Sequence, residues 1–321
     1  MSTREGGGRA QDAGTAQSEA QPKPAGLAPS AGAVQRPERV GIVSFTNVAP
    51  LNWGLKPWAS AGGQAEFVYG VPTKLNAALA AGDIDLTLVS SIEFIRHRDR
   101  YRALLDFSIA TLGPVYSVML FHRPGWRDLH GARIAVTTES ATSVELLRVL
   151  LEADGVRAEL VPTAGGLDDL LAVADAALLI GDAALKGAVR HVPPTQGGPG
   201  GRPISGRSAV EPGLHVTDLG EAWYRLTRLP FTFAVWASRE DARPSEALVA
   251  AFREARRSGL GHLGAVAAVE AEKLGLPPGI VQRYLENFRY YLEPPDLDGL
   301  YAFARRSDPS FQERELRFWE E

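Results

Sequence analysis

Short apolar runs alternate with helical patterns along most of the chain. Runs typical of buried strands occur at 40–45, 84–89 and 133–137, and each is followed by polar residues and then by a helical pattern. Two further short strands are predicted at 66–69 and 176–180. Repeated strand–turn–helix units of this kind predict an α/β protein in which most strands run parallel.

The predicted helices begin and end at residues typical of helix boundaries. The helix over 71–81 closes at Gly82, because glycine adopts the left-handed conformation that often follows a helix. The helix over 144–152 is preceded by a candidate capping box from Thr142 to Glu145. Beyond Arg243 the chain is predicted to be helical, with helices over 244–263, 266–273, 278–288 and 295–307.

Two longer apolar segments, 115–121 and 231–237, are predicted to be long strands that cross between two lobes, the second making the return crossing. Residues 181–185 are predicted to end another strand in a polar turn, where Asp182 could meet a ligand, although we favour a role in capping the turn. The pattern predicts these parts: a disordered tail at 1–38, a first lobe from 39–114 plus 238–321, and a second lobe from 115–237 with a flexible insertion at 191–213.

Composition excludes several classes of protein. The 321 residues are 45% hydrophobic and 22% charged with a net charge of -4, and no stretch concentrates Lys and Arg enough to follow a nucleic-acid backbone. The chain has no cysteine, which excludes disulfides, thiol catalysis and iron–sulfur ligation. Its six histidines are scattered without a metal-binding spacing, so we expect no metal site.

The first 37 residues are rich in Ala, Gly, Gln, Ser and Pro and contain few aliphatic residues. Such a segment buries too little apolar surface to offset the entropy of ordering, so we expect it to be disordered. It lacks the apolar core of a secretory signal, and the chain has no run of 18 apolar residues. We therefore expect a cytoplasmic protein that does not cross a membrane.

Polar residues gather where the predicted strands end and the next helices begin. Ser90 and Ser91 lie between a strand and a helix that opens at Ile92, where free N–H groups and the helix dipole suit a carboxylate or phosphate. One of these serines could instead only cap its own helix. The same arrangement recurs along the chain, giving a set of hydroxyl and amide residues with few cations among them: Ser44, Thr46, Asn47, Ser90, Ser91, Thr138, Ser140, Thr142 and Ser143.

Several of these segments together resemble the MqnA family, the chorismate dehydratases of the futalosine route to menaquinone. The resemblance runs from about Val40 to the last predicted helices, excluding the tail and the 191–213 insertion. It is carried by VGIVSFTNVAPL at 40–51, PTKL at 72–75, GDIDLTLVSSIEF at 82–94, GPVYSV at 113–118, TSV at 142–144, and DLGEAW with LPF between 218 and 231.

The resemblance implies a two-lobed fold similar to type II periplasmic binding proteins, with two crossing strands and a helical C-terminal tail. It implies removal of water from chorismate to give 3-[(1-carboxyvinyl)oxy]benzoate, with no metal or organic cofactor. It places Asn47 and Ser90 or Ser91 in catalysis. We expect Asn47 and Ser90 to be catalytic, and we expect substrate contacts from Ser44, Thr46, Ser91, Gly113, Ser140, Thr142 and Ser143.

The identity of the base that takes the ring proton stays open at this point. The resemblance suggests the enolpyruvyl carboxylate of the substrate itself, and Glu93 is the nearest protein candidate, although its place at a helix start favours a dipole role. Asn47 can hold the leaving hydroxyl or a carboxylate, but its amide cannot act as a base at neutral pH. We expect chorismate as a small dianionic partner, with no nucleic acid or membrane partner, and leave the oligomeric state open.

Two alternatives share the fold. A solute-binding or ligand-sensing protein is one, because a fold alone does not imply catalysis. The other is 1,4-dihydroxy-6-naphthoate synthase, a related enzyme that uses a catalytic histidine. No histidine of this chain lies at a predicted strand-to-helix junction, which favours the dehydratase.

Overall fold

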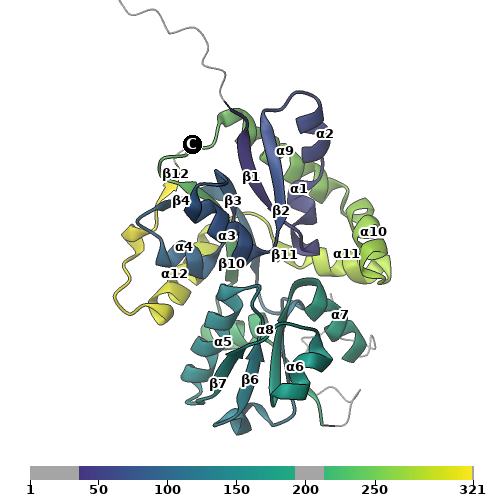
Figure 1. Cartoon of the computed structure of the whole chain (residues 1–321), viewed down its shortest axis with the longest axis vertical. Helices are drawn as coiled ribbons and strands as arrows, with labels where there is room; N and C mark the ends of the chain where they lie inside the picture. Colours follow the sequence, from purple (N-terminus) through teal and green to yellow (C-terminus); the bar gives the residue numbers. More distant parts are fainter. Residues whose placement is uncertain (1–35, 192–212, 320–321) are drawn as a thin grey trace, which may run out of the picture. The chain divides into compact units, whose positions relative to one another are not determined.

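A computed structural model describes residues 36–191 and 213–319, and its helices and strands can be followed in Figure 1. Nearly all of the predicted tail at 1–38 and of the predicted insertion at 191–213 lies outside the described residues. Within the described residues, no helix is both long and apolar enough to cross a membrane.

The first sheet is mixed, with strand order β2-β1-β3-β10-β4-β11 and β12 beside β4. Strand β1 pairs in parallel with β2 and β3, whereas β10 pairs antiparallel with β3 and β4. The strands are β1 (Glu38–Val43), β2 (Ala65–Gly70), β3 (Leu86–Ser90), β4 (Tyr101–Thr111), β10 (Phe231–Arg239), β11 (Phe288–Arg289) and β12 (Phe318–Trp319).

The second sheet has the order β7-β6-β8-β5-β9. Strand β6 is parallel to β7 and β8, and β5 is antiparallel to β8 and β9. The strands are β5 (Val118–His122), β6 (Arg133–Val136), β7 (Glu159–Pro162), β8 (Ala176–Ile180) and β9 (His215–Asp218). Strands β5 and β8 are buried along their whole length, which explains why their sequences are continuously apolar rather than alternating.

Helices pack against both sheets. Helix α3 contacts β1 and β3, α4 and α12 contact β10, and α6 and α7 contact β8. The helices are α1 (Ala49–Asn52), α2 (Leu55–Ser60), α3 (Pro72–Ala81), α4 (Ser91–Arg96), α5 (Ala141–Ala153), α6 (Leu167–Val173), α7 (Gly181–His191), α8 (Leu219–Thr227), α9 (Glu246–Gly261), α10 (Leu263–Leu274), α11 (Pro278–Glu286) and α12 (Pro294–Ser307). Short 3-10 helices are η1 (Thr46–Val48), η2 (Trp126–Leu129) and η3 (Glu313–Glu315).

Two predicted helix boundaries had different outcomes. Gly82 ends α3 in the left-handed conformation, with a φ of 82°, as predicted. The predicted capping box from Thr142 to Glu145 is wrong, because α5 begins one residue before Thr142. Its N-cap is Ser140, whose hydroxyl accepts a hydrogen bond from the Ser143 amide.

The two segments predicted to cross between the lobes lie in different sheets. Strand β5 belongs to the second sheet, whereas β10 belongs to the first, so the residues at 231–237 lie in the first sheet. The predicted strand over 115–121 begins only at Val118, because Tyr116 adopts a left-handed φ of 61°. Such a φ is uncommon for a residue with a side chain. The exact division of the chain into two lobes stays a prediction.

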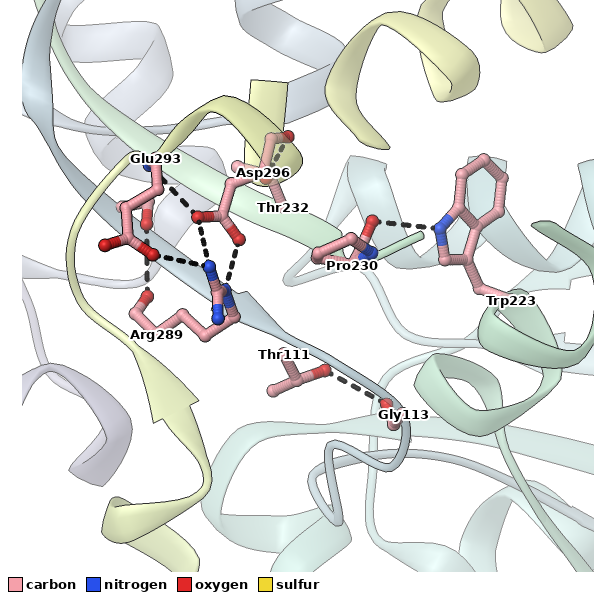
Figure 2. Close-up of polar contacts among 9 residues, drawn as sticks. Thr111, Gly113, Trp223, Pro230, Thr232, Arg289, Glu293 and Asp296 are labelled. Atoms are coloured by element: carbon pink, nitrogen blue, oxygen red, sulfur yellow. Dashed lines mark hydrogen bonds and ion pairs between the residues drawn. The ribbon is translucent and has the colours of Figure 1, made fainter. Parts of the chain in front are cut away.

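An aromatic and polar cluster fixes the return of the chain from α8 to β10. The rings of Trp223 and Phe231 lie 5.2 Å apart, and the Trp223 indole donates a hydrogen bond of 3.1 Å to the Pro230 carbonyl (Figure 2). Beside it, the Thr232 hydroxyl donates to the Asp296 carbonyl at 3.0 Å. Since these donors and acceptors are buried, each satisfied bond removes a desolvation cost from the native state.

Salt bridges hold the start of α12 against the end of β11. The buried Asp296 carboxylate accepts from the Arg289 guanidinium at 2.6 and 3.1 Å, and Glu293 accepts from the same guanidinium at 2.7 Å (Figure 2). The two carboxylates raise the pKa of Arg289 through hydrogen bonds with Asp296 above all. These salt bridges therefore connect the end of β11 to the first turn of α12.

Candidate active site

A small cavity of about 70 Å³ lies where ends of strands from both sheets meet helix beginnings. Its lining includes the end of β1, η1, the end of β3, the start of α5 and the end of β8. Its polar lining residues are all hydroxyls or amides: Asn47, Ser90, Ser117, Ser140, Thr142 and Ser143. No Asp, Glu, His, Lys, Arg or Tyr is among the described residues that line it.

Asn47 lies in the middle of η1, directly after β1. Its side-chain oxygen is buried and finds no hydrogen-bond partner among the described residues. A buried amide oxygen left without a donor costs about 1–3 kcal/mol. The Asn47 oxygen can therefore accept a hydrogen bond from a ligand hydroxyl with little further desolvation.

Ser90 ends β3 and faces the cavity. It occupies the N-cap position of α4, yet its hydroxyl makes no capping bond and instead accepts from the Asn76 amide at 3.2 Å. The side-chain oxygen of Asn76 is buried without a partner in the described part of the chain. The sequence did not identify Asn76 as a site residue, because it lies within the helical run of α3. The feature that could have identified it is a single amide side chain on the buried, otherwise apolar face of that helix.

Ser91 lies beside Ser90 but points elsewhere. Its side chain is fully buried and its hydroxyl donates a 2.6 Å hydrogen bond to the carbonyl of Thr232 on β10. It does not line the cavity. In the structure Ser91 therefore forms a bond between α4 and the first sheet, and its contact with substrate stays a prediction.

The beginning of α5 supplies three of the cavity's hydroxyls. Ser140 donates to the Ser143 hydroxyl at 3.0 Å and accepts from the Ser143 amide at 3.2 Å. Thr142 accepts a 3.0 Å hydrogen bond from the amide of Ile92, in the first turn of α4. The thirteen-residue α5 directs the positive end of its dipole toward this point, which suits the carboxylate of a ligand.

Ser117 is a lining residue that sequence reasoning did not single out. Its hydroxyl accepts a 2.9 Å hydrogen bond from the phenol of Tyr284 on α11 and contacts the carbonyl of Val115 at 3.4 Å. Burial raises the pKa of Tyr284, so this phenol stays neutral and acts as the donor. Ser117 was not recognised as a site residue because it occurs within an alternating run of residues that predicts a strand.

Three other predicted substrate contacts do not reach this cavity. Ser44 lines a neighbouring cavity of about 680 Å³, which shares Val43, Phe45 and Val48 with the smaller one. Thr46 is buried, and its amide donates to Asp182 at 3.1 Å rather than toward the cavity. The lining of the small cavity does not include these two residues, and their contact with substrate stays a prediction.

Gly113 is the third of these residues, and its contact with substrate likewise stays a prediction. It turns the chain after β4 with a left-handed φ of 96°, and its carbonyl accepts a 3.1 Å hydrogen bond from the Thr111 hydroxyl (Figure 2). Glu93 also lies outside the cavity lining, and its carboxylate pairs with His97 at 2.7 Å on the same helix. Gly113 thus serves the turn between the sheets, and Glu93 stabilises α4.

Comparison with known proteins identifies the family of this chain. The family described as "Menaquinone biosynthesis" matches residues 38–308. A chorismate dehydratase from Thermus thermophilus is 45% identical over 269 residues, which covers 84% of this chain and 94% of that protein. The chain belongs to this menaquinone-biosynthesis family. The predicted resemblance to the MqnA family is confirmed.

Two solved structures of low sequence identity are similar to this chain in fold. A protein from Archaeoglobus fulgidus superposes with a TM-score of 0.64 at 18% identity, covering 86% of this chain and 98% of that one. The periplasmic aliphatic sulphonate binding protein of Escherichia coli gives a TM-score of 0.58 at 17% identity, covering 89% and 92%. The predicted α/β fold similar to periplasmic binding proteins is confirmed for this family member.

Proposed function

We propose that this protein is a chorismate dehydratase, which eliminates water from chorismate to give 3-[(1-carboxyvinyl)oxy]benzoate. The observation that carries the proposal is the 45% identity to the dehydratase of Thermus thermophilus along nearly the whole of that protein. The cavity supports it, because chorismate carries two carboxylates and one ring hydroxyl, and the lining offers hydroxyl and amide groups for each. We place the protein in the cytoplasm because the proposed reaction is a biosynthetic one.

The lining suggests how the substrate is held. One carboxylate lies at the start of α5, where the first-turn amides and the hydroxyls of Ser140 and Ser143 meet it. The ring hydroxyl donates to the unpaired oxygen of Asn47, and Ser90 and Ser117 add further hydroxyl contacts. Each positioned contact of this kind is worth roughly 10²-fold in turnover when it acts on developing charge.

The absence of an ionisable group from the described lining supports a base supplied by the substrate. In this scheme the enolpyruvyl carboxylate takes the proton from the neighbouring ring carbon, the C–H electrons form the new ring double bond, and the C–O bond to the hydroxyl breaks. The proton and the hydroxyl leave together as one water. Aromatisation of the ring drives the step, so the protein mainly orients the substrate and assists the leaving hydroxyl.

The size of the cavity implies a conformational step. Its volume of about 70 Å³ is well below the ~300–1,000 Å³ of sites that enclose small organic ligands. Chorismate therefore enters after the elements around the cavity separate. The hydrogen bonds from Ile92 to Thr142 and from Thr46 to Asp182 join these elements, and we place their formation at closure.

The test is incubation of the purified protein with chorismate, followed by chromatography and mass spectrometry. The proposal predicts loss of chorismate and appearance of a product lighter by one water, at a rate proportional to protein concentration. Binding of chorismate without turnover would instead indicate a solute-binding protein. Neither binding nor turnover would overturn the proposal and direct attention to the naphthoate-forming reaction.

A further inference from the structure

The first turn of α7 contacts the loop that carries Asn47. The ring of Phe45 packs so closely on Gly181 that a Cβ added there would lie 2.8 Å from it. The next residue, Asp182, accepts a 3.1 Å hydrogen bond from the amide of Thr46. Two consecutive residues of α7 therefore hold the two residues that directly precede Asn47.

This contact joins elements that follow different sheets. Helix α7 follows β8 of the second sheet, whereas Thr46 follows β1 of the first. Gly181 is fixed from its own side as well, because its amide donates to the Ser117 carbonyl at 2.8 Å. The contact thus links the end of β8, and through it Ser117, to the loop of Asn47.

The Asp182 carboxylate is held by hydrogen bonds from Thr46, and the charges of Glu270 and Lys186 also act on it. Thr46 is 1% exposed, and its hydroxyl contacts the Glu270 carboxylate at 3.4 Å, while Lys273 pairs with Glu270 at 2.5 Å. Burial raises the pKa of Asp182, and the hydrogen bonds from Thr46 act in the opposite direction. Asp182 itself does not line the small cavity.

We propose that Asp182 is a positioning residue of the dehydration: by accepting the Thr46 amide it fixes the backbone ahead of Asn47 and so orients the Asn47 side chain in the cavity. The inference rests on the proposed function. Because the contact crosses between elements of the two sheets, it forms only when they close, and it couples closure to the placement of Asn47. The predicted role of Asp182 as the cap of a turn is replaced by this one, since residues 181–191 are helical.

The test compares steady-state kinetics of variants on chorismate. Asp182→Ala is expected to lower kcat about tenfold or more with KM changed less than about threefold, because positioning acts on the reactive geometry. Asp182→Asn keeps an oxygen that accepts the Thr46 amide, so its kcat is expected within about threefold of wild type. The matched control is Glu272→Ala, an exposed carboxylate on α10 close in sequence to Glu270, with wild-type kinetics expected.

A double-mutant cycle with Asn47→Ala gives the decisive readout. If Asp182 acts through Asn47, adding Asp182→Ala to Asn47→Ala costs less than about twofold in kcat, whereas independent roles would multiply the two losses. Equal losses in both backgrounds, or wild-type kcat in Asp182→Ala, would overturn the inference while the proposed function stands. Asp182→Glu, which displaces the carboxylate by one methylene, replaces the alanine variant if that one does not fold. No turnover by the wild type would overturn the proposed function and this inference with it.

Discussion

Ser90 and Ser91 are neighbours whose hydroxyls have different partners. Ser90 faces the cavity and accepts from Asn76, whereas Ser91 donates to the Thr232 carbonyl in the first sheet. The sequence predicted a polar site at this point because a strand meets a helix there. It could not show which hydroxyl turns inward, since that depends on where β10 lies, and β10 is about 140 residues further along the chain.

Mutations of these two serines are expected to affect different properties of the protein. Ser90→Ala is expected to lower turnover of chorismate by roughly 10-fold to 10²-fold, because it removes a hydroxyl from the cavity. Ser91→Ala is expected to lower the free energy of unfolding by about 1–2 kcal/mol, because it leaves the Thr232 carbonyl buried without its donor. Turnover kinetics and urea unfolding of both variants check this. A larger loss of turnover in Ser91→Ala than in Ser90→Ala would contradict the assignment.

The strand–helix units could be predicted from the sequence, whereas the extent of the strand at 115–121 could not. The strands of 40–45, 84–89 and 133–137 were recognised from their apolar runs and the polar residues after them. The segment 115–121 alternates like a strand, but the Asp218 carboxylate accepts the amides of Val115 and Tyr116 at 2.7–3.0 Å and stops the strand from extending. Sequence periodicity does not report a side chain that lies a hundred residues away.

Asp218 also predicts a pH dependence of stability. Burial raises its pKa to about 6, against hydrogen bonds from four backbone amides that lower it. A carboxyl with a raised pKa in the folded state binds its proton more tightly there than in the unfolded chain. Its contribution therefore increases the free energy of unfolding as the pH falls from about 6 toward 4.

Comparison of wild type with Asp218→Asn isolates this contribution, because the asparagine does not titrate. The unfolding free energy of the wild type relative to the variant is expected to rise by about 2 kcal/mol between pH 7 and pH 4.5. Urea unfolding at both values measures it. A difference that stays constant, or falls on acidification, would show that Asp218 keeps an ordinary pKa in the folded state.

For the whole molecule, the sequence predicted the fold class because the βα pattern and the family resemblance both point to it. It did not predict how far the elements around the cavity are closed, because closure depends on contacts such as Thr46 to Asp182 and Ile92 to Thr142 that no local pattern encodes. The proposed closure step assigns these contacts to a closed form, because a cavity of about 70 Å³ is smaller than a site that encloses a small organic ligand.

Hydrogen exchange tests closure at two named amides. The amides of Thr46 and Ile92 donate between elements that surround the cavity, so binding of chorismate or its product is expected to slow their exchange about tenfold or more. The amide of Asp85 serves as the control, because it donates to the Arg39 carbonyl within the first sheet and is expected to exchange equally in both states. Equal protection of Thr46 and Ile92 with and without ligand would contradict a closure step.

The most direct test of the proposed function is steady-state turnover of chorismate by the wild type beside Asn47→Ala, with product identified by its mass. The wild type is expected to release 3-[(1-carboxyvinyl)oxy]benzoate, and Asn47→Ala to do so about 10²-fold more slowly with an unchanged circular dichroism spectrum, because one positioned polar contact is lost. A wild type that binds chorismate without consuming it would contradict the dehydratase function. An Asn47→Ala variant as fast as the wild type would contradict the site.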